Sequence, residues 1–289
     1  MPDTPVSRDF VLTLRCPDTP GIVHAVSGFL VRSSGNIVES QQFGDSETGR
    51  FFMRVQFETL DPAVGLEELR ASFDDVATEF EMTWELWMAG APYRTLILVS
   101  KFGHCLNDLL FRTSTGSLQI EIPAIVSNHR DFERLADSYG IAFHHIPVSS
   151  ETKADAESRL LELVDELGIH LVVLARYMQV LSDATCRALS GRAINIHHSF
   201  LPSFKGARPY HQAHQRGVKL IGATAHYVTS DLDEGPIIEQ DVARVDHNFT
   251  AEQLASTGRD VESQVLSRAV RWHSETRVMS NGAKTVVFR

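Results

Sequence analysis

Within the first 90 residues, apolar side chains either alternate with polar ones or recur at helical spacing. Alternation predicts half-buried strands, whereas helical spacing predicts amphipathic helices. In chain order the predicted elements are a strand at 10–14, a helix at 22–30, strands at 36–43 and 50–57, a helix at 66–76 and a strand at 80–86. This βαββαβ order is the split arrangement of ferredoxin-like domains, so we expect residues 7–89 to form one small domain.

A short linker, Ala89-Gly-Ala-Pro92, separates this region from one with a different rhythm. Beyond it, short apolar strands alternate with amphipathic helices. The predicted strands are 95–100, 120–127, 141–148, 169–174, 193–197, 220–228 and 237–243, and the predicted helices are 131–139, 154–167 and 251–272. The alternation predicts an α/β fold over residues 94–289 with a Rossmann-like, mostly parallel sheet, whose ligand crevice lies at the carboxyl ends of the strands.

The composition fits two folded domains. The chain has 289 residues, of which 43% are hydrophobic, so a wholly disordered chain is excluded. Its three cysteines (Cys16, Cys105 and Cys186) lie far apart, which argues against both a disulfide framework and a cysteine-rich zinc site. The N-terminal residues lack the apolar stretch of a signal peptide, and every apolar run is shorter than the ~20 residues that cross a bilayer. We therefore expect a cytoplasmic protein with no membrane partner.

The charge is unevenly distributed along the chain. A formal net charge of −10 argues against nucleic acid as a partner, yet residues 184–230 contain no Asp or Glu. The basic residues of this stretch are Arg187, Arg192, Lys205, Arg208, Arg216 and Lys219. Charge alone favours a solvated face here, and the alternative is a loop that meets an anionic ligand.

The segment Ile194-Asn-Ile-His-His-Ser-Phe-Leu-Pro202 carries the clearest candidate chemistry. Strand alternation places Asn195 and His197 on one face, and His197 lies at the end of the strand. An amide and an imidazole side by side can donate hydrogen bonds to a developing oxyanion, and the imidazole can act as a general acid. The alternative is a buried pair that satisfies backbone groups.

Three carboxylates follow in one turn, Asp231, Asp233 and Glu234, directly before Gly235-Pro236. One of them could raise the pKa of the imidazole or activate water as a base. A solvated turn would use the same residue types, and spacing does not choose among the three.

A metal site is not expected from the histidines. His211 and His214 are one helical turn apart, but they lack the HExxH arrangement, and the acid-free stretch holds no carboxylate to complete a ligand set. Cys105 is expected to be a small buried side chain rather than a nucleophile.

Residues 194–206 together with Leu232-Asp-Glu-Gly-Pro-Ile-Ile238 closely resemble the folate-dependent formyltransferase superfamily. The N-terminal segment 12–23, Leu-Thr-Leu-Arg-Cys-Pro-Asp-Thr-Pro-Gly-Ile-Val, is similar to an ACT domain, a small regulatory module. An ACT domain fused ahead of such a domain is typical of the formyltetrahydrofolate deformylase family. The resemblance implies an ACT regulatory domain at 7–89 and a formyltransferase-like catalytic domain at 94–289.

The resemblance also implies an activity. Members of this family hydrolyse 10-formyltetrahydrofolate to tetrahydrofolate and formate, which supplies formate for purine biosynthesis and balances the one-carbon folate pool. The expected enzyme needs no metal or other cofactor, since folate is the substrate. Two alternatives stay open, namely a folate-dependent formyltransferase acting on an amine and an inactive folate-binding regulator.

The family's functional residues fall on positions of this chain. The catalytic Asn, His and Asp correspond to Asn195, His197 and Asp233, and Asp233 is the expected base, directly or through His197. The expected substrate-binding residues are Tyr177, Met178, Gln179, Val180, Leu181, His198, Thr229 and Leu232. The expected effector-binding residues of the ACT domain are Asp18, Gly21 and Ile22. The effector implied is glycine or methionine, and we expect a homo-oligomer.

Two departures from the transferases bear on the acceptor. His198 stands where many transferases have proline, and Lys101-Phe-Gly-His-Cys-Leu106 replaces their phosphate-gripping loop. Both fit a site that admits water instead of a formyl acceptor. Whether Lys205, Arg208 or Arg216 contacts the folate glutamate tail or the formate is a hypothesis that charge-neutralising variants would test.

Overall fold

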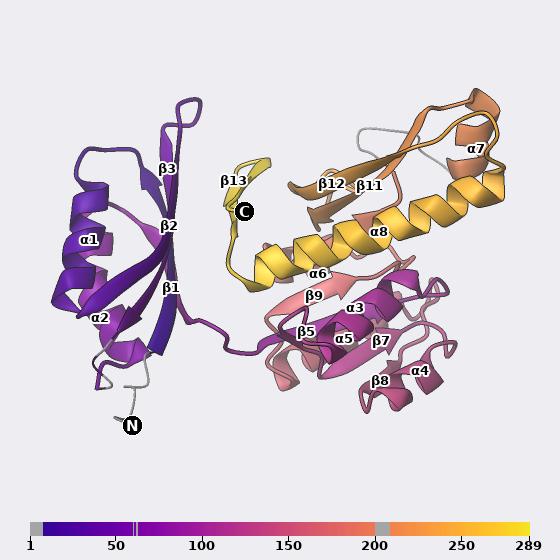
Figure 1. Cartoon of the computed structure of the whole chain (residues 1–289). Helices are drawn as coiled ribbons and strands as arrows, with labels where there is room; N and C mark the ends of the chain where they lie inside the picture. Colours follow the sequence, from indigo (N-terminus) through magenta and orange to yellow (C-terminus); the bar gives the residue numbers. More distant parts are fainter. Residues whose placement is uncertain (1–7, 60, 62, 200–208) are drawn as a thin grey trace, which may run out of the picture. The chain divides into compact units, whose positions relative to one another are not determined.

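The structure, a computed structural model, describes residues 8–59, 61, 63–199 and 209–289, which form two compact units (Figure 1). Of the described residues, the first unit comprises those up to Ala91 together with Glu275–Met279 and Val286–Arg289, and the second comprises those of Pro92–Ser274 and Ser280–Thr285. The division expected at the linker therefore differs from the structure at the end of the chain. The last residues of the chain group with the first unit, whereas the sequence predicts one domain over residues 94–289.

The first unit is a four-stranded antiparallel sheet in the order β2-β3-β1-β4 with two helices on one face (Figure 1). Its elements are β1 (Arg8–Pro17), α1 (Ile22–Arg32), β2 (Gly35–Asp45), β3 (Arg50–Thr59), α2 (Leu66–Glu79) and β4 (Thr83–Met88). The helical spacing of the apolar residues directs Val26 and Phe29 of α1 inward, where Phe29 packs edge-on against Phe73 with ring centroids 4.9 Å apart. The predicted ferredoxin-like arrangement is confirmed.

The last strand of this unit begins later than predicted. The alternation of residues 80–86 indicated a strand from Phe80, but Phe80 is the C-cap of α2 and Glu81 has a positive φ of 52°. A left-handed residue turns the chain out of the helix before the strand begins at Thr83.

The second unit is built on an eight-stranded sheet in the order β12-β11-β10-β9-β5-β7-β8, with β6 paired to β5. Its strands are β5 (Tyr93–Val99), β6 (Ile120–Glu121), β7 (Ala124–Ser127), β8 (Ala142–His145), β9 (Leu171–Leu174), β10 (Ala193–His197), β11 (Leu220–Tyr227) and β12 (Ile237–Arg244). The pairs from β10 to β8 are parallel, whereas β10–β11 and β11–β12 are antiparallel. The expected mostly parallel sheet is confirmed, although the strand predicted at 120–127 is divided at Pro123, which cannot donate a ladder hydrogen bond.

Six helices of the described chain belong to this unit. They are α3 (His104–Ser114), α4 (Glu133–Ser138), α5 (Lys153–Glu166), α6 (Asp183–Ala188), α7 (Pro209–Arg216) and α8 (Ala251–Ser274). Helices α3, α6 and α7 are not among the elements predicted from the sequence. Helix α8 packs against β11, β12 and α3, and after it come two short paired strands, β13 (Val278–Asn281) and β14 (Lys284–Val287). Among the described residues, no helix is long and apolar enough to cross a bilayer.

The strand order reverses beside β5. From β5 the chain proceeds through β7 to β8 on one side of the sheet and then through β9 to β10 on the other. Parallel α/β sheets bind ligands at such a reversal, outside the carboxyl ends of the strands. Those ends are Val99 of β5, Leu174 of β9 and His197 of β10.

Candidate active site

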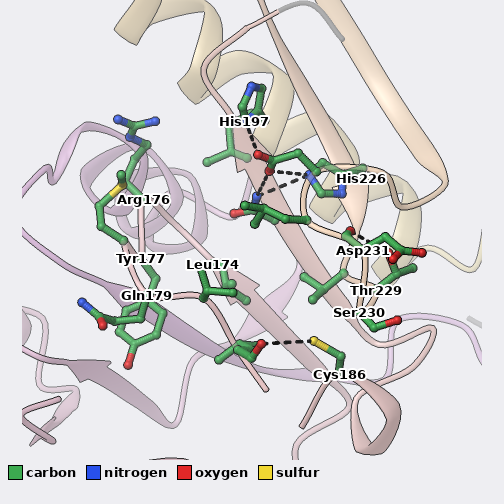
Figure 2. A pocket seen from close by; sticks show the side chains of 18 of the residues that line it. Leu174, Arg176, Tyr177, Gln179, Cys186, His197, His226, Thr229, Ser230 and Asp231 are labelled. Carbon is green, nitrogen blue, oxygen red and sulfur yellow. Dashed lines mark hydrogen bonds and ion pairs between the residues drawn. The ribbon is translucent and has the colours of Figure 1, made fainter. Parts of the chain in front are cut away.

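A pocket of about 220 Å³ opens at this edge of the sheet (Figure 2). The structure brings together there all eleven residues predicted for catalysis and substrate binding, which are Asn195, His197, Asp233, Tyr177, Met178, Gln179, Val180, Leu181, His198, Thr229 and Leu232. They come from the segment after β9, from the end of β10 and from the loop between β11 and β12. Their roles remain predictions, but their proximity follows from the topology.

Strand β10 positions the amide and the imidazole. In this strand Ile194 and Ile196 are buried, whereas Asn195 and His197 are partly exposed on the same side, as strand alternation predicts. Asn195 lies opposite His226 in the antiparallel pairing with β11. The two neighbouring strands thus place a second imidazole beside the predicted pair.

The loop from 228 to 236 has the conformation that presents Asp233. Asp233 has a positive φ of 59°, a left-handed conformation that Asp tolerates better than most residues. Two positions later, a Cβ on Gly235 would lie 1.7 Å from the carbonyl oxygen of Tyr227, so only glycine fits this close approach. Tyr227 N–H donates to the Pro236 carbonyl at 2.9 Å and closes the loop.

Asp233 lies between the two imidazoles. Its Oδ2 is 3.2 Å from His197 Nδ1, and its Oδ1 is 3.6 Å from His226 Nε2. The hydrogen bonds to His197 and His226 outweigh burial and hold the pKa of Asp233 well below its ordinary value, so the carboxylate is ionised at neutral pH. Of the other two candidate carboxylates, Asp231 lines the pocket, and Glu234 is exposed and does not line it.

His226 was named in the sequence analysis neither as a catalytic nor as a binding residue. Its Nδ1 lies 2.9 Å from the Tyr227 carbonyl, which can only accept, so Nδ1 carries a proton. Its Nε2 lies 3.3 Å from Asn195 Nδ2 and faces Asp233 Oδ1, to which the Asn195 amide donates at 3.5 Å. The buried His226 therefore holds the amide and the carboxylate in place from the side opposite His197.

A nitrogen of the predicted catalytic histidine has no hydrogen-bond partner within the described part of the chain. His197 Nδ1 faces Asp233, while Nε2 is buried and has no hydrogen-bond partner among the described residues. Buried polar atoms are rarely unpaired in folded proteins, and those that are unpaired need an explanation. A nitrogen held in this way is suited to exchange a proton with a bound ligand or water.

The pocket wall carries exposed apolar side chains both after β9 and in the loop between β11 and β12. Met178, Val180 and Leu232 have exposed fractions of 55%, 57% and 63%. Ser100, which follows β5, fixes the wall by accepting a hydrogen bond from the Met178 N–H at 2.9 Å. Large apolar side chains that are exposed inside a pocket are suited to contact an apolar part of a ligand.

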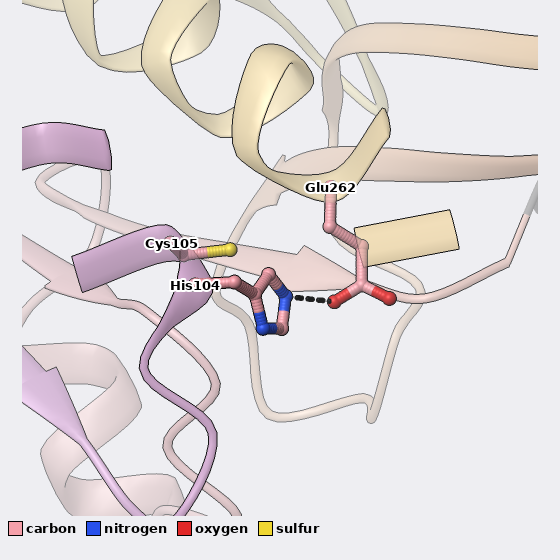
Figure 3. A group of neighbouring side chains, drawn as sticks. All are labelled: His104, Cys105 and Glu262. Atoms are coloured by element: carbon pink, nitrogen blue, oxygen red, sulfur yellow. Dashed lines mark hydrogen bonds and ion pairs between the residues drawn. The ribbon is translucent and has the colours of Figure 1, made fainter. Parts of the chain in front are cut away.

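A metal ligand set is geometrically present elsewhere in this unit. His104, Cys105 and Glu262 have potential ligand atoms within 4.8 Å of one another (Figure 3). The surroundings do not suit a cation, because Arg176 Nε is 3.4 Å from the same Glu262 carboxylate. Burial also raises the pKa of the Cys105 thiol and disfavours the thiolate that would bind a metal.

The predicted effector residues belong to the first unit. Gly21 caps the start of α1 with a positive φ of 103°, and Ile22 is the first residue of that helix and is buried. Asp18 N–H donates to the Gly49 carbonyl at 2.9 Å, and a Cβ on Gly44 would lie 3.1 Å from Asp18 Oδ2. These residues gather at the turn between β1 and α1, as their sequence proximity requires.

The basic stretch is only partly within the described residues. Lys205 and Arg208 lie outside them, so no contact is assigned to either. Arg216 is exposed at the end of α7 and is not among the described residues that line the pocket.

The chain matches two protein families and is similar to known proteins over nearly its whole length. The chain matches the formyl transferase family over residues 93–270 and the ACT domain family over residues 10–74. The formyltetrahydrofolate deformylase of Corynebacterium sp. (strain P-1) is 57% identical over 279 residues, which cover 96% of this chain and 98% of that protein. The formyltetrahydrofolate deformylase of Bacillus subtilis (strain 168) is 49% identical, over 96% of this chain and 93% of that protein.

A solved structure agrees with these relatives. The crystal structure of formyltetrahydrofolate deformylase from Burkholderia mallei ATCC 23344 superposes with a TM-score of 0.94 at 52% identity. The match covers 98% of this chain and 100% of that chain, so it includes both units.

Proposed function

Because the chain belongs to the formyltetrahydrofolate deformylase family, we propose that it hydrolyses 10-formyltetrahydrofolate to tetrahydrofolate and formate. The observation that carries the proposal is the 3.2 Å contact between Asp233 and His197 at the wall of the pocket. Ionised Asp233 accepts from Nδ1, which orients Nε2, a nitrogen with no partner among the described residues, as the atom that meets the reacting groups.

The first step is the addition of water to the formyl carbon. The water oxygen bonds to this carbon and loses a proton to the pair formed by Asp233 and His197. Negative charge then develops on the formyl oxygen, and the Asn195 amide and the protonated imidazole are suitable donors to it. Asp233 keeps the imidazolium paired during this step, since the two groups are within hydrogen-bond reach.

The second step breaks the bond between the formyl carbon and the folate nitrogen. His197 returns the proton to that nitrogen as it departs, and the carbon leaves as formate with one oxygen from water. Water thus supplies one oxygen of formate and one hydrogen of tetrahydrofolate, and its other hydrogen leaves as a proton when the formic acid ionises to formate, so the atoms balance. The step requires no metal or redox cofactor, because an N-formyl group on folate is already an activated acyl donor.

The apolar wall supports the substrate class. Tyr177, Met178 and Val180 offer faces for a flat ring system, and Thr229 and Leu232 close the opposite side. We assign the products to the supply of formate for purine biosynthesis and to the balance of the folate pool, in the cytoplasm. The alternative, transfer of the formyl group to an amine, is not favoured by the relatives named above.

An assay without an acceptor tests this function. We expect formate and tetrahydrofolate in a one-to-one ratio from 10-formyltetrahydrofolate and buffer alone, with no increase when amines are added. Turnover that depends on an added amine would favour the transferase, and tight folate binding without turnover would favour an inactive regulator.

We propose that the first unit regulates the enzyme by binding an amino acid. We expect glycine or methionine to bind near Asp18 and Gly21 in a homo-oligomer whose ACT domains pair between copies, as the resemblance implies. Isothermal titration should detect binding of one amino acid to the wild type and weakening of at least about tenfold in Asp18→Ala, because a charged hydrogen bond is lost. Equal affinity in wild type and variant would remove Asp18 from the effector site.

A further inference from the structure

A buried charged cluster adjoins the reaction centre. The Glu262 side chain on α8 is 1% exposed, and His104 Nε2 donates to its Oε2 at 2.8 Å. The Tyr210 hydroxyl donates to Oε1 at 2.8 Å, and Arg176 Nε lies 3.4 Å from Oε2. A Cβ on Gly258, one turn earlier in α8, would lie 2.0 Å from the Tyr210 oxygen, so this glycine makes room for the hydroxyl.

Arg176 connects this cluster to the pocket. It follows β9 and has a positive φ of 64°, an uncommon conformation for a residue other than glycine. Its NH1 donates to His198 Nδ1 at 2.9 Å, and its guanidinium carbon lies 5.7 Å from the centre of the Phe102 ring. Glu262 therefore forms an ion pair with the guanidinium at Nε, which has no hydrogen-bond partner among the described residues, while NH1 holds His198.

His198 is stacked on the reacting imidazole. The rings of His197 and His198 have centroids 4.8 Å apart and are inclined by 29°. Since Arg176 only donates, His198 Nδ1 must accept, which fixes the tautomer and the orientation of the ring. Asp233 in turn holds the His197 ring through its Nδ1.

Charged and titratable groups surround the stacked rings of His197 and His198. The charged or titratable groups that face His198 are Arg176, His197, Glu262 and Asp233, and the Tyr210 ring is tilted at 6.4 Å. Burial, with the positive charge of Arg176 next, lowers the pKa of His198 to about 4. A neutral His198 lets a positive charge form on the neighbouring imidazole without repulsion inside the stack.

We propose that Arg176, clamped by Glu262, is a positioning residue of the hydrolytic reaction: it fixes His198 as a neutral platform that holds the His197 ring against Asp233. This inference rests on the proposed function. It assigns a role to an arginine and a glutamate that are 86 positions apart and that neither sequence motif includes.

The experiment compares Arg176→Met with Arg176→Lys and with a control, Arg268→Met, whose ion pairs are to Glu239 and Asp241 on β12. We expect Arg176→Met to lower kcat about 10- to 100-fold with KM changed less than about threefold, because positioning contributes to turnover more than to binding. The lysine variant should recover part of kcat, and the control should stay within about twofold of wild type.

The titration of His198, followed by NMR in histidine-labelled protein, distinguishes positioning from a merely structural role. In Arg176→Met we expect the His198 pKa to rise and the acidic limb of the kcat profile to move to higher pH. A uniform loss of kcat with unchanged His198 titration would overturn the proposal. The NMR result does not depend on turnover, so it tests the geometry even if the wild type releases no formate and the proposed function fails.

A double variant guards against simple destabilisation. Arg176→Met leaves Glu262 buried without its cation, which can destabilise the fold, whereas Arg176→Met with Glu262→Gln removes both charges. If Arg176 positions His198, the double variant folds and stays slow. Recovery of kcat in the double variant would show that Arg176 only neutralises Glu262 and would overturn the proposal.

Discussion

Replacing Asp233 with asparagine is expected to reduce kcat by about two to four orders of magnitude while substrate affinity changes only a few fold. Asparagine has nearly the same volume, so it preserves the loop and the contacts with the pocket wall. It removes the negative charge that accepts from His197 Nδ1 at 3.2 Å and that, together with His197, takes up the proton of water in the proposed reaction. Formate release measured at saturating folate, with binding measured separately, gives both quantities.

The matched control for Asp233→Asn is Glu234→Gln. Glu234 is the next residue in the same loop and is exposed outside the pocket. It should retain kcat within about twofold, as do most surface substitutions. Unchanged turnover in a folded Asp233→Asn protein would remove this carboxylate from the role of base and leave the imidazole to act alone.

Replacing Gly235 with alanine is expected to be the most damaging single-methyl change in the catalytic unit. The new Cβ would lie 1.7 Å from the Tyr227 carbonyl oxygen, which is backbone and cannot rotate away. The loop must shift to relieve the clash, and this costs about 1–3 kcal/mol of unfolding free energy. Because Asp233 is two residues away, a displacement of about 1 Å should also cost about 100-fold in kcat.

Thermal unfolding and formate release together measure both effects of Gly235→Ala. The control is Gly28→Ala in α1, where the nearest atom to a new Cβ is the terminal nitrogen of the flexible Arg32 side chain, 3.3 Å away. Alanine in a helix should leave stability unchanged or slightly higher. Wild-type stability and turnover in Gly235→Ala would show that the tight closure at Tyr227 is not needed to position Asp233.

The sequence predicted those parts of the fold that depend on local pattern. Alternation in residues 193–197 is a property of any strand, so the shared face of Asn195 and His197 followed directly from spacing. Helix α3 was omitted although Cys105, Leu106, Leu109 and Leu110 recur at helical spacing and are buried in the structure. This helix therefore does have a local signal in the sequence.

Other parts of the site depend on the tertiary structure and have no local signal. Which of the three carboxylates faces the imidazoles depends on a left-handed residue at 233 and a close approach at Gly235, and neither is visible as a pattern. In the sequence, Glu262 has the pattern of a solvent-exposed glutamate on a long amphipathic helix. Its ion pair with Arg176 depends on how α8 packs in the fold, which the local pattern does not show. The return of Glu275–Met279 to the first unit is likewise a tertiary event.

The central claim is that water, rather than an amine, attacks the formyl carbon beside Asp233 and His197. The most direct measurement is the mass of the formate released from 10-formyltetrahydrofolate in water enriched in oxygen-18, without any acceptor. The account predicts formate with one labelled oxygen and one unlabelled oxygen, formed in equal amount to tetrahydrofolate. Unlabelled formate, or no formate until an amine is added, would contradict it.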